Sequence, residues 1–185
     1  MKGTLWEGGH RIPFVIRWPE TIKAGMVSDQ LISTNDLLAT CAELIGKKLP
    51  DNVAEDSVSF LPAIKGEAIP GAAERMLVHH SDDGHFAVRK GKWKLVLDEH
   101  GGSRRGRDEQ VKQPISDAAG IMLFDMEKDL GETANLSSEH PEVVVSLKKE
   151  LIGIINKGRS TPGAPQENYK LKEGEKWVQM EELLK

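Results

Sequence analysis

The chain has 185 residues, of which 38% are hydrophobic and 29% charged, with a formal net charge of -4. This composition is typical of a soluble globular protein of one or two domains and excludes an intrinsically disordered chain. Basic residues are scattered apart from a cluster at 104–107, which we interpret as a solvated loop, so we expect no nucleic acid partner. No stretch approaches the about 18 consecutive apolar residues of a membrane span, so we expect no membrane partner.

The first 50 residues predict one strand and one helix. Residues 12–18 form a nearly continuous apolar run of β-branched and aromatic side chains, which favours a strand buried on both faces. Residues 35–45 place apolar side chains at helical spacing and predict an amphipathic helix with Cys41 in the core. A buried strand needs a sheet around it. We therefore expect 1–50 to be the C-terminal edge of a larger α/β domain, followed by a connecting segment at 51–74.

The second half of the sequence predicts a compact α+β subdomain at 75–158. Strand-like runs separated by turn residues favour an antiparallel meander, and they lie at 75–80, 85–89, 92–97 and 120–125. A helix is predicted from Pro141, a favoured first helical residue, to Gly158. One helix on about four antiparallel strands makes a self-sufficient core. We expect an extended tail at 159–185, with a short helix near its end.

The most specific motif is KGTLWEGGHRIP at residues 2–13. It resembles the K-G-T-x-[YW]-E-G-G-x-R-x-P signature of the formylglycine-dependent sulfatases, which belong to the alkaline phosphatase superfamily. Shorter matches follow in the same order and extend the resemblance to residue 158, namely 18–19, 36–37, 86–95, 123–125, 131–136 and 140–142. The stretches at 79–81 and 158–163 look most like bacterial enzymes near arylsulfatase A and N-acetylgalactosamine-6-sulfatase.

The resemblance assigns Lys2 to the substrate sulfate. An ammonium is a compact donor that stabilises negative charge on sulfate oxygens, which sulfate-ester cleavage requires. The resemblance also implies that the strand at 75–80 approaches the substrate pocket, which makes His79 and His80 candidates for contacting the sugar or aryl alcohol. Adjacent strand residues point to opposite faces, so the two histidines are poor joint metal ligands. A packed or exposed histidine is the alternative for each.

The residues after Lys2 suggest how its loop is held. Gly8 and Gly9 suit a backbone conformation or a close approach that a Cβ would block. Glu7 and Arg11 predict an ion pair that fixes the loop, since a guanidinium suits bidentate pairing with a carboxylate. We give these four residues a structural role in the site loop.

The sequence lacks the other parts that the resemblance implies for an active sulfatase. The formylglycine nucleophile is made from Cys or Ser in a C/S-x-P-x-R setting, and the single cysteine, Cys41, lies in TCAEL instead. The family's calcium ligands lie upstream of the lysine, and we predict no metal ligands here. We therefore expect a C-terminal fragment that is inactive alone, with calcium and formylglycine supplied by the parent enzyme.

Three functions remain open at this point. The first is part of a sulfatase acting on an aryl or carbohydrate sulfate. The second is part of a phosphodiesterase or phosphonate hydrolase of the same superfamily, because phosphate presents similar oxygens to a lysine. The third is a stand-alone binding module that self-associates through the truncated face. A periplasmic or secreted parent fits the resemblance, but one cysteine leaves the compartment undetermined.

Overall fold

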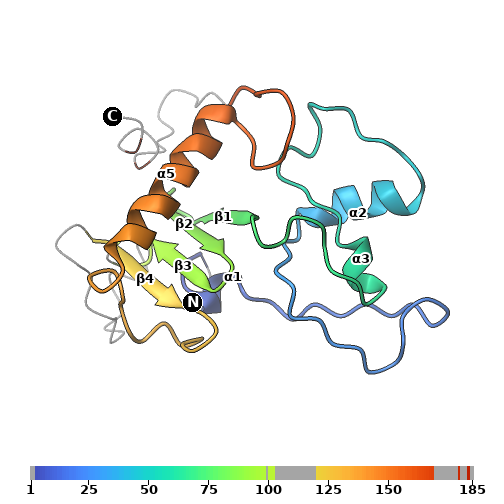
Figure 1. Cartoon of the computed structure of the whole chain (residues 1–185), viewed down its shortest axis with the longest axis horizontal. Helices are drawn as coiled ribbons and strands as arrows, with labels where there is room; N and C mark the ends of the chain where they lie inside the picture. The colour runs from blue at the N-terminus through green and yellow to red at the C-terminus, as the bar shows by residue number, and fades with distance from the viewer. Residues whose placement is uncertain (1–2, 99, 103–119, 169–178, 180–182, 184–185) are drawn as a thin grey trace. The chain divides into compact units, whose positions relative to one another are not determined.

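The computed structural model describes residues 3–98, 100–102, 120–168, 179 and 183 (Figure 1). The chain forms two compact units, each built from segments that are distant in sequence. Unit 1 comprises residues 1–12, 76–156 and 169–185, and unit 2 comprises 13–75 and 157–168. The domain boundaries expected from the sequence stay predictions.

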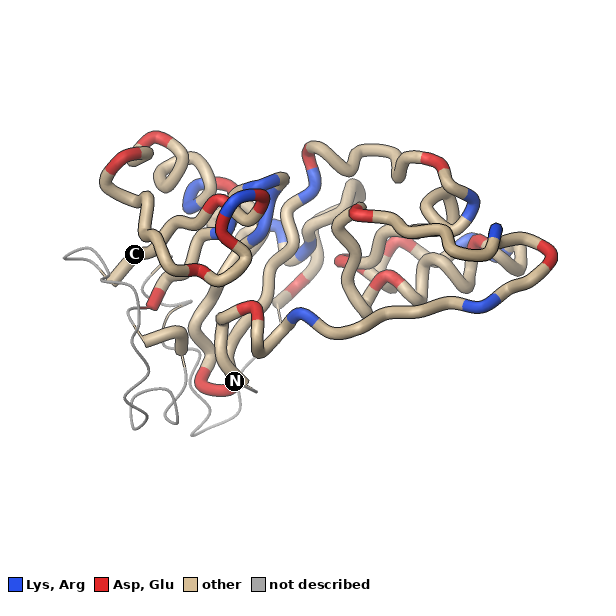
Figure 2. Tube along the Cα trace, turned by 90° about the horizontal axis from the view of Figure 1, so that it is seen from below, with Lys and Arg blue, Asp and Glu red and all other residues tan. Residues whose placement is uncertain are grey.

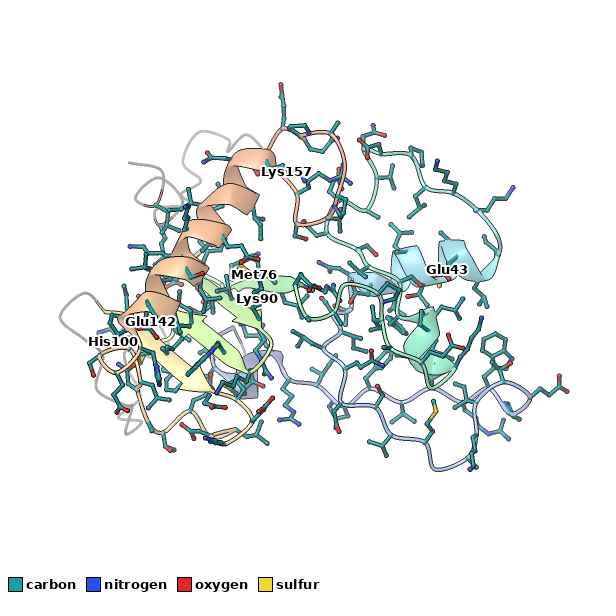
Figure 3. The ribbon with its side chains drawn as sticks, in the orientation of Figure 1. Glu43, Met76, Lys90, His100, Glu142 and Lys157 are labelled. Carbon is teal, nitrogen blue, oxygen red and sulfur yellow. The ribbon has the colours of Figure 1, made fainter. Side chains whose placement is uncertain are left out.

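The centre of unit 1 is a four-stranded antiparallel sheet in which neighbours in sequence pair in space. This confirms the predicted meander. Figure 3 shows the labelled Met76 and Lys90 near each other, as their pairing across the first two strands requires. The strands are β1 (Met76–His80), β2 (Phe86–Lys90), β3 (Trp93–Val96) and β4 (Met122–Asp125).

Helix α5 (Pro141–Lys157) covers one face of this sheet, as predicted (Figure 1). Its buried residues Leu147, Leu151 and Ile155 recur every four positions and so lie on one side of the helix. They pack against alternate residues of the strands, which point to the same face of the sheet. The core on this face also contains Met76, Phe86, Val88, Leu95, Leu97 and Leu123.

Unit 2 is built around two short helices, α2 (Asp36–Leu44) and α3 (Leu61–Ile64). Their junction is polar: the buried Asp36 carboxylate receives two guanidinium hydrogen bonds from Arg75, at 2.5 and 2.8 Å, and one from the Val58 backbone N–H. The Thr40 hydroxyl accepts a hydrogen bond from the Phe60 N–H. These bonds fix α2 against the chain that leads into α3.

The predicted strand at 12–18 is wrong within this structure. These residues form no strand and are largely exposed, with Val15 88% accessible. The physical reason is that a strand needs a neighbouring backbone to complete its hydrogen bonds, and none of the described residues pairs with this run.

Helix α2 forms close to the predicted bounds, but it packs through a different face. It buries Asp36, Thr40 and Ala42, whereas Leu37, Leu38 and Ile45 are exposed. The prediction of Cys41 as a core residue is therefore wrong, because this thiol is also exposed. Helical spacing identified the apolar face, and the polar bonds of Asp36 and Thr40 decide which face packs in this chain.

Acidic and basic residues are interspersed along the described trace (Figure 2). No helix among the described residues is both long and apolar enough to cross a membrane. The short helix predicted near the C-terminus falls almost wholly outside the described residues.

Breaking the buried Asp36–Arg75 pair should strongly destabilise unit 2. Replacement of Arg75→Met should lower the free energy of unfolding by about 3 kcal/mol, because it leaves a buried carboxylate without its cation. Urea unfolding followed by circular dichroism measures this. The matched control is Lys90→Met, whose pair with Glu150 is about one third exposed and should contribute less than about 1 kcal/mol. Equal losses for the two variants would contradict the prediction.

Candidate functional site

Residues 3–10, which we call the N-terminal loop, pack on the sheet face opposite α5. Leu5 is fully buried there among alternate strand residues that include Val96 and Phe124. Trp6 adds an edge-to-face contact with Phe124, with ring centroids 6.0 Å apart. The loop continues into one helical turn, α1 (Glu7–His10). The hydrophobic contacts of Leu5 and Trp6 thus hold the segment directly after Lys2 on the sheet.

Backbone hydrogen bonds fix the same loop at both sides of Thr4. The Leu5 N–H donates to Gly101 O at 2.8 Å, and the Asp82 N–H donates to Gly3 O at 3.0 Å. Gly3 has a φ of 84°, and a Cβ there would lie 2.9 Å from Asp82 Oδ2. The positive φ favours glycine at this position, and a Cβ would also require the Asp82 carboxylate to shift.

A buried charge cluster lies beneath α1. Lys94 of β3 is fully buried, and its Nζ is 2.9 Å from Glu7 Oε1 and 2.6 Å from Glu132 Oε1. The Glu7 backbone N–H donates to the other oxygen of Glu132 at 2.7 Å. Burying an ammonium is costly unless carboxylates compensate it. Lys94 therefore depends on α1 and on the loop after β4 for its partners.

Glu132 reaches this cluster through an unusual backbone conformation. Its φ is 55°, in the left-handed region that residues with a Cβ seldom adopt. Such a conformation costs about 1 kcal/mol or more and persists where the surroundings determine it. The pairing with Lys94 and the Glu7 N–H supplies that determination.

The ion pair expected between Glu7 and Arg11 is not formed in the described part of the chain, where Glu7 pairs with Lys94. Lys94 is buried beside the loop and needs a carboxylate more than the exposed Arg11 does. Arg89 adds a second cation near Glu7. Burial lowers the pKa of the Arg89 guanidinium, the negative charge of Glu7 opposes this effect, and the group stays charged.

Gly8 and Gly9 lie within the helical turn α1. Neither has a positive φ, so an unusual backbone conformation is not their role. The prediction that Gly8 and Gly9 allow another group to approach closely stays a prediction. Lys2 lies outside the described residues, and its sulfate role also stays a prediction.

His79 and His80 point to opposite faces of the sheet, as predicted. His79 pairs with Ala87 and so faces the N-terminal loop, where its ring lies 4.2 Å from that of His10. The Nε2 atoms of both rings are shielded from solvent and have no hydrogen-bond partner among the residues that the structure describes. His80 is exposed. Contact of either predicted residue with substrate stays a prediction.

Burial, with smaller contributions from the nearby His10 and Lys94, lowers the pKa of His79 to about 2. Burial also lowers the pKa of His10, with a further contribution from Lys94 that Glu7 opposes. Both rings are therefore neutral at pH 7.

The β1–β2 turn is held by a polar network around His85. The His85 ring lies 2.9 Å from Asp83 Oδ1 and 3.3 Å from Asp98 Oδ2. The Ser81 hydroxyl donates to Asp83 and accepts the His85 N–H. The carboxylates of Asp83 and Asp98 therefore stabilise the turn and the segment that follows β3.

Comparison with protein families matches residues 2–101 to the family described as N-sulphoglucosamine sulphohydrolase, C-terminal. The chain belongs to this sulfatase family. The match begins at Lys2 and covers the loop, the charge partner Lys94 and three strands of the sheet. It confirms the resemblance to the sulfatases.

Individual sulfatases match over most of the chain. N-acetylgalactosamine-6-O-sulfatase of Bacteroides thetaiotaomicron is 29% identical over 150 residues, which is 81% of this chain and 28% of that protein. Human arylsulfatase A is 34% identical over 162 residues, covering 80% of this chain and 31% of that protein. The chain thus spans less than a third of these relatives.

A solved structure supports the fold of this sulfatase chain. It comes from work on the metabolism of multiple glycosaminoglycans by Bacteroides thetaiotaomicron and is 27% identical. The TM-score is 0.63, with 83% of this chain and 31% of that chain covered. The α+β arrangement of sheet and helix is therefore that of known sulfatases.

Sequence reasoning missed the charge cluster, although all three members lie in the motifs that carry the sulfatase resemblance. Glu7 is in the opening signature, Lys94 in the match at 86–95 and Glu132 in the match at 131–136. The available signal was Lys94 itself, a single cation between apolar strand residues. Such a residue predicts a buried partner of opposite charge.

The buried His79 should make stability depend on pH. The unfolded histidine has a pKa near 6.5 and the folded one about 2, so the unfolded state binds more protons between these values. The free energy of unfolding should therefore fall as pH drops below 6.5, by up to about 1.4 kcal/mol per pH unit. Urea unfolding at pH 7.5 and 5.5 measures this fall.

The variant His79→Gln should show a smaller fall, because its side chain takes up no proton. The matched control is His80→Gln, an exposed residue at the end of β1, which should keep the full fall. The prediction fails if His79→Gln and the unmodified protein lose equal stability between the two pH values.

Proposed function

We propose that this chain supplies the sulfate-binding lysine, Lys2, and the support of its loop to a sulfatase that hydrolyses carbohydrate sulfate esters. The observation that carries the proposal is the docking of residues 3–10 on the sheet, which fixes the chain immediately after Lys2. A fixed loop matters because a charge stabilises a transition state most when it needs no rearrangement.

Lys2 would act on the sulfate oxygens. Its ammonium has three N–H donors and a compact charge, which suit a tetrahedral anion. Negative charge on the sulfur–oxygen group rises as the ester bond breaks, and a positioned cation stabilises that change. The neutral His10 and His79 lie on the sheet face that carries the loop and add no positive charge there.

The nucleophile and the calcium ion belong, in this proposal, to parts of a sulfatase outside these 185 residues. The sequence has no C/S-x-P-x-R stretch from which formylglycine is made. Four carboxylates near the loop already have partners: Glu7 and Glu132 pair with Lys94, and Asp83 and Asp98 contact His85. The described residues contain no group of three or more side chains suited to a metal.

Carbohydrate sulfates are the favoured substrate class because a relative covering 81% of the chain is an N-acetylgalactosamine-6-O-sulfatase. Arylsulfatases also match, which makes an aryl sulfate the second substrate class. The proposed substrate is thus a sugar carrying a sulfate ester.

The isolated chain should not hydrolyse sulfate esters, because it contains no formylglycine sequence. The assay uses the pure protein with calcium, and p-nitrocatechol sulfate and N-acetylgalactosamine 6-sulfate as substrates. Turnover above that of a heat-denatured sample would contradict this part of the proposal.

A chimera tests the role of Lys2. This chain replaces the matching C-terminal part of the Bacteroides thetaiotaomicron relative, and hydrolysis of N-acetylgalactosamine 6-sulfate is measured. We expect an active chimera in which Lys2→Ala lowers kcat/KM by about 10²- to 10³-fold, the usual effect of removing one charge-stabilising donor.

The matched control in the chimera is Lys23→Ala, an exposed lysine of unit 2, which should leave kcat/KM unchanged. A thermal melt establishes that each variant folds. A folded chimera that hydrolyses the diester bis(p-nitrophenyl) phosphate but no sulfate would favour the phosphodiesterase alternative. Full activity of Lys2→Ala would overturn the assignment of this lysine.

A further inference from the structure

Lys94 occupies a position that packing alone would give to an apolar residue. It pairs with Phe124 across β3 and β4, on the sheet face where Leu5, Val96 and Met122 form a hydrophobic cluster. A buried ion pair is often no more stabilising than well-packed apolar side chains of similar volume. Stability of the sheet therefore does not explain why an ammonium lies here.

The two partners of Lys94 explain its position better. Glu7 begins α1, five residues after Lys2, and Glu132 lies in the loop that follows β4. Neither carboxylate belongs to the sheet, so the ammonium joins two segments that are 87 and 38 residues away in sequence. The Lys94 Nζ contacts both carboxylates in the interior of the protein, out of contact with solvent.

The two carboxylate segments are also joined to each other. The Glu7 N–H, at the start of α1, donates to Glu132 Oε2 at 2.7 Å. Both carboxylates also lie within 3 Å of the same Lys94 Nζ, and carboxylates that share a site repel each other unless a cation lies between them. Removing the ammonium would therefore separate Glu7 from Glu132 and release the start of α1 from the sheet.

We propose that Lys94 is a positioning residue, which acts through Glu7 and Glu132 to hold the loop that carries Lys2. This inference rests on the proposed function, which assigns Lys2 of that loop to sulfate binding. Lys94 itself touches no substrate, since its Nζ is enclosed by the two carboxylates. Its contribution to catalysis is to fix where the ammonium of Lys2 can lie.

Amide hydrogen exchange of the 185-residue chain tests the docking independently of any activity. The Leu5 N–H is protected by its hydrogen bond to Gly101 O, and the Glu7 N–H by its hydrogen bond to Glu132. In Lys94→Met these hydrogen bonds should open more often, so both N–H groups should exchange about tenfold faster or more. The amide N–H groups of the paired β1 and β2 should keep their protection. The matched control is Lys92→Met, whose partner Asp125 lies at the rim of the sheet and which should leave the loop protected.

Glu132→Ala provides a second variant that leaves the sheet unchanged. This variant removes the carboxylate that the loop after β4 contributes to Lys94 and to the Glu7 N–H. It should give the same faster exchange at Glu7. Unchanged exchange in both variants would overturn the proposal. Faster exchange throughout the sheet would also overturn it, because Lys94 would then support the whole fold rather than the loop.

A double-mutant cycle in the chimera tests the link to Lys2. Lys94→Met should lower kcat/KM in the unmodified chimera but have no further effect once Lys2→Ala is present, because both changes remove the same contribution. Additive losses would overturn the proposal. If Lys2→Ala alone had no effect, the proposed function would fail, and the exchange experiment would still decide whether Lys94 holds the loop.

Discussion

The buried ammonium of Lys94 is the interaction on which the docking of the N-terminal loop to the sheet of unit 1 depends. It lies between Glu7 of α1 and Glu132 of the loop after β4, and both carboxylates approach it within 3 Å. A buried ammonium is costly unless carboxylates compensate its charge. Lys94 of the sheet therefore favours the arrangement in which the N-terminal loop and the loop after β4 both bring their carboxylates to it. Hydrophobic burial of Leu5 adds strength to this arrangement, whereas the charges make it specific.

Local patterns in the sequence were sufficient for most of unit 1. The strands of the meander and helix α5 have their own signals, namely alternation, turn residues and a four-residue apolar repeat. Residues 12–18 show the limit of such signals. Their apolar run predicts a strand correctly only where another strand is available, and sequence pattern does not tell which neighbours a segment has.

The candidate site was predictable as a set of motifs but not as a spatial cluster. Lys2 and Glu7 were identified from the opening signature, yet Glu7 was assigned to Arg11, its near neighbour in sequence. The structure gives it Lys94, 87 residues away. Pairing over that distance depends on strand register and on the left-handed turn at Glu132, and neither leaves a short-range signal.

The separation of the three charged segments has a consequence for synthesis of the protein. Glu7 and Glu132 are 125 residues apart, so at about 5–20 residues per second the ribosome makes Glu132 roughly 6–25 s after Glu7. During that interval the N-terminal loop has no complete set of partners, and Leu5 and Trp6 are open to other contacts. We expect the loop to be among the last parts of unit 1 to reach its native place, after the sheet has formed.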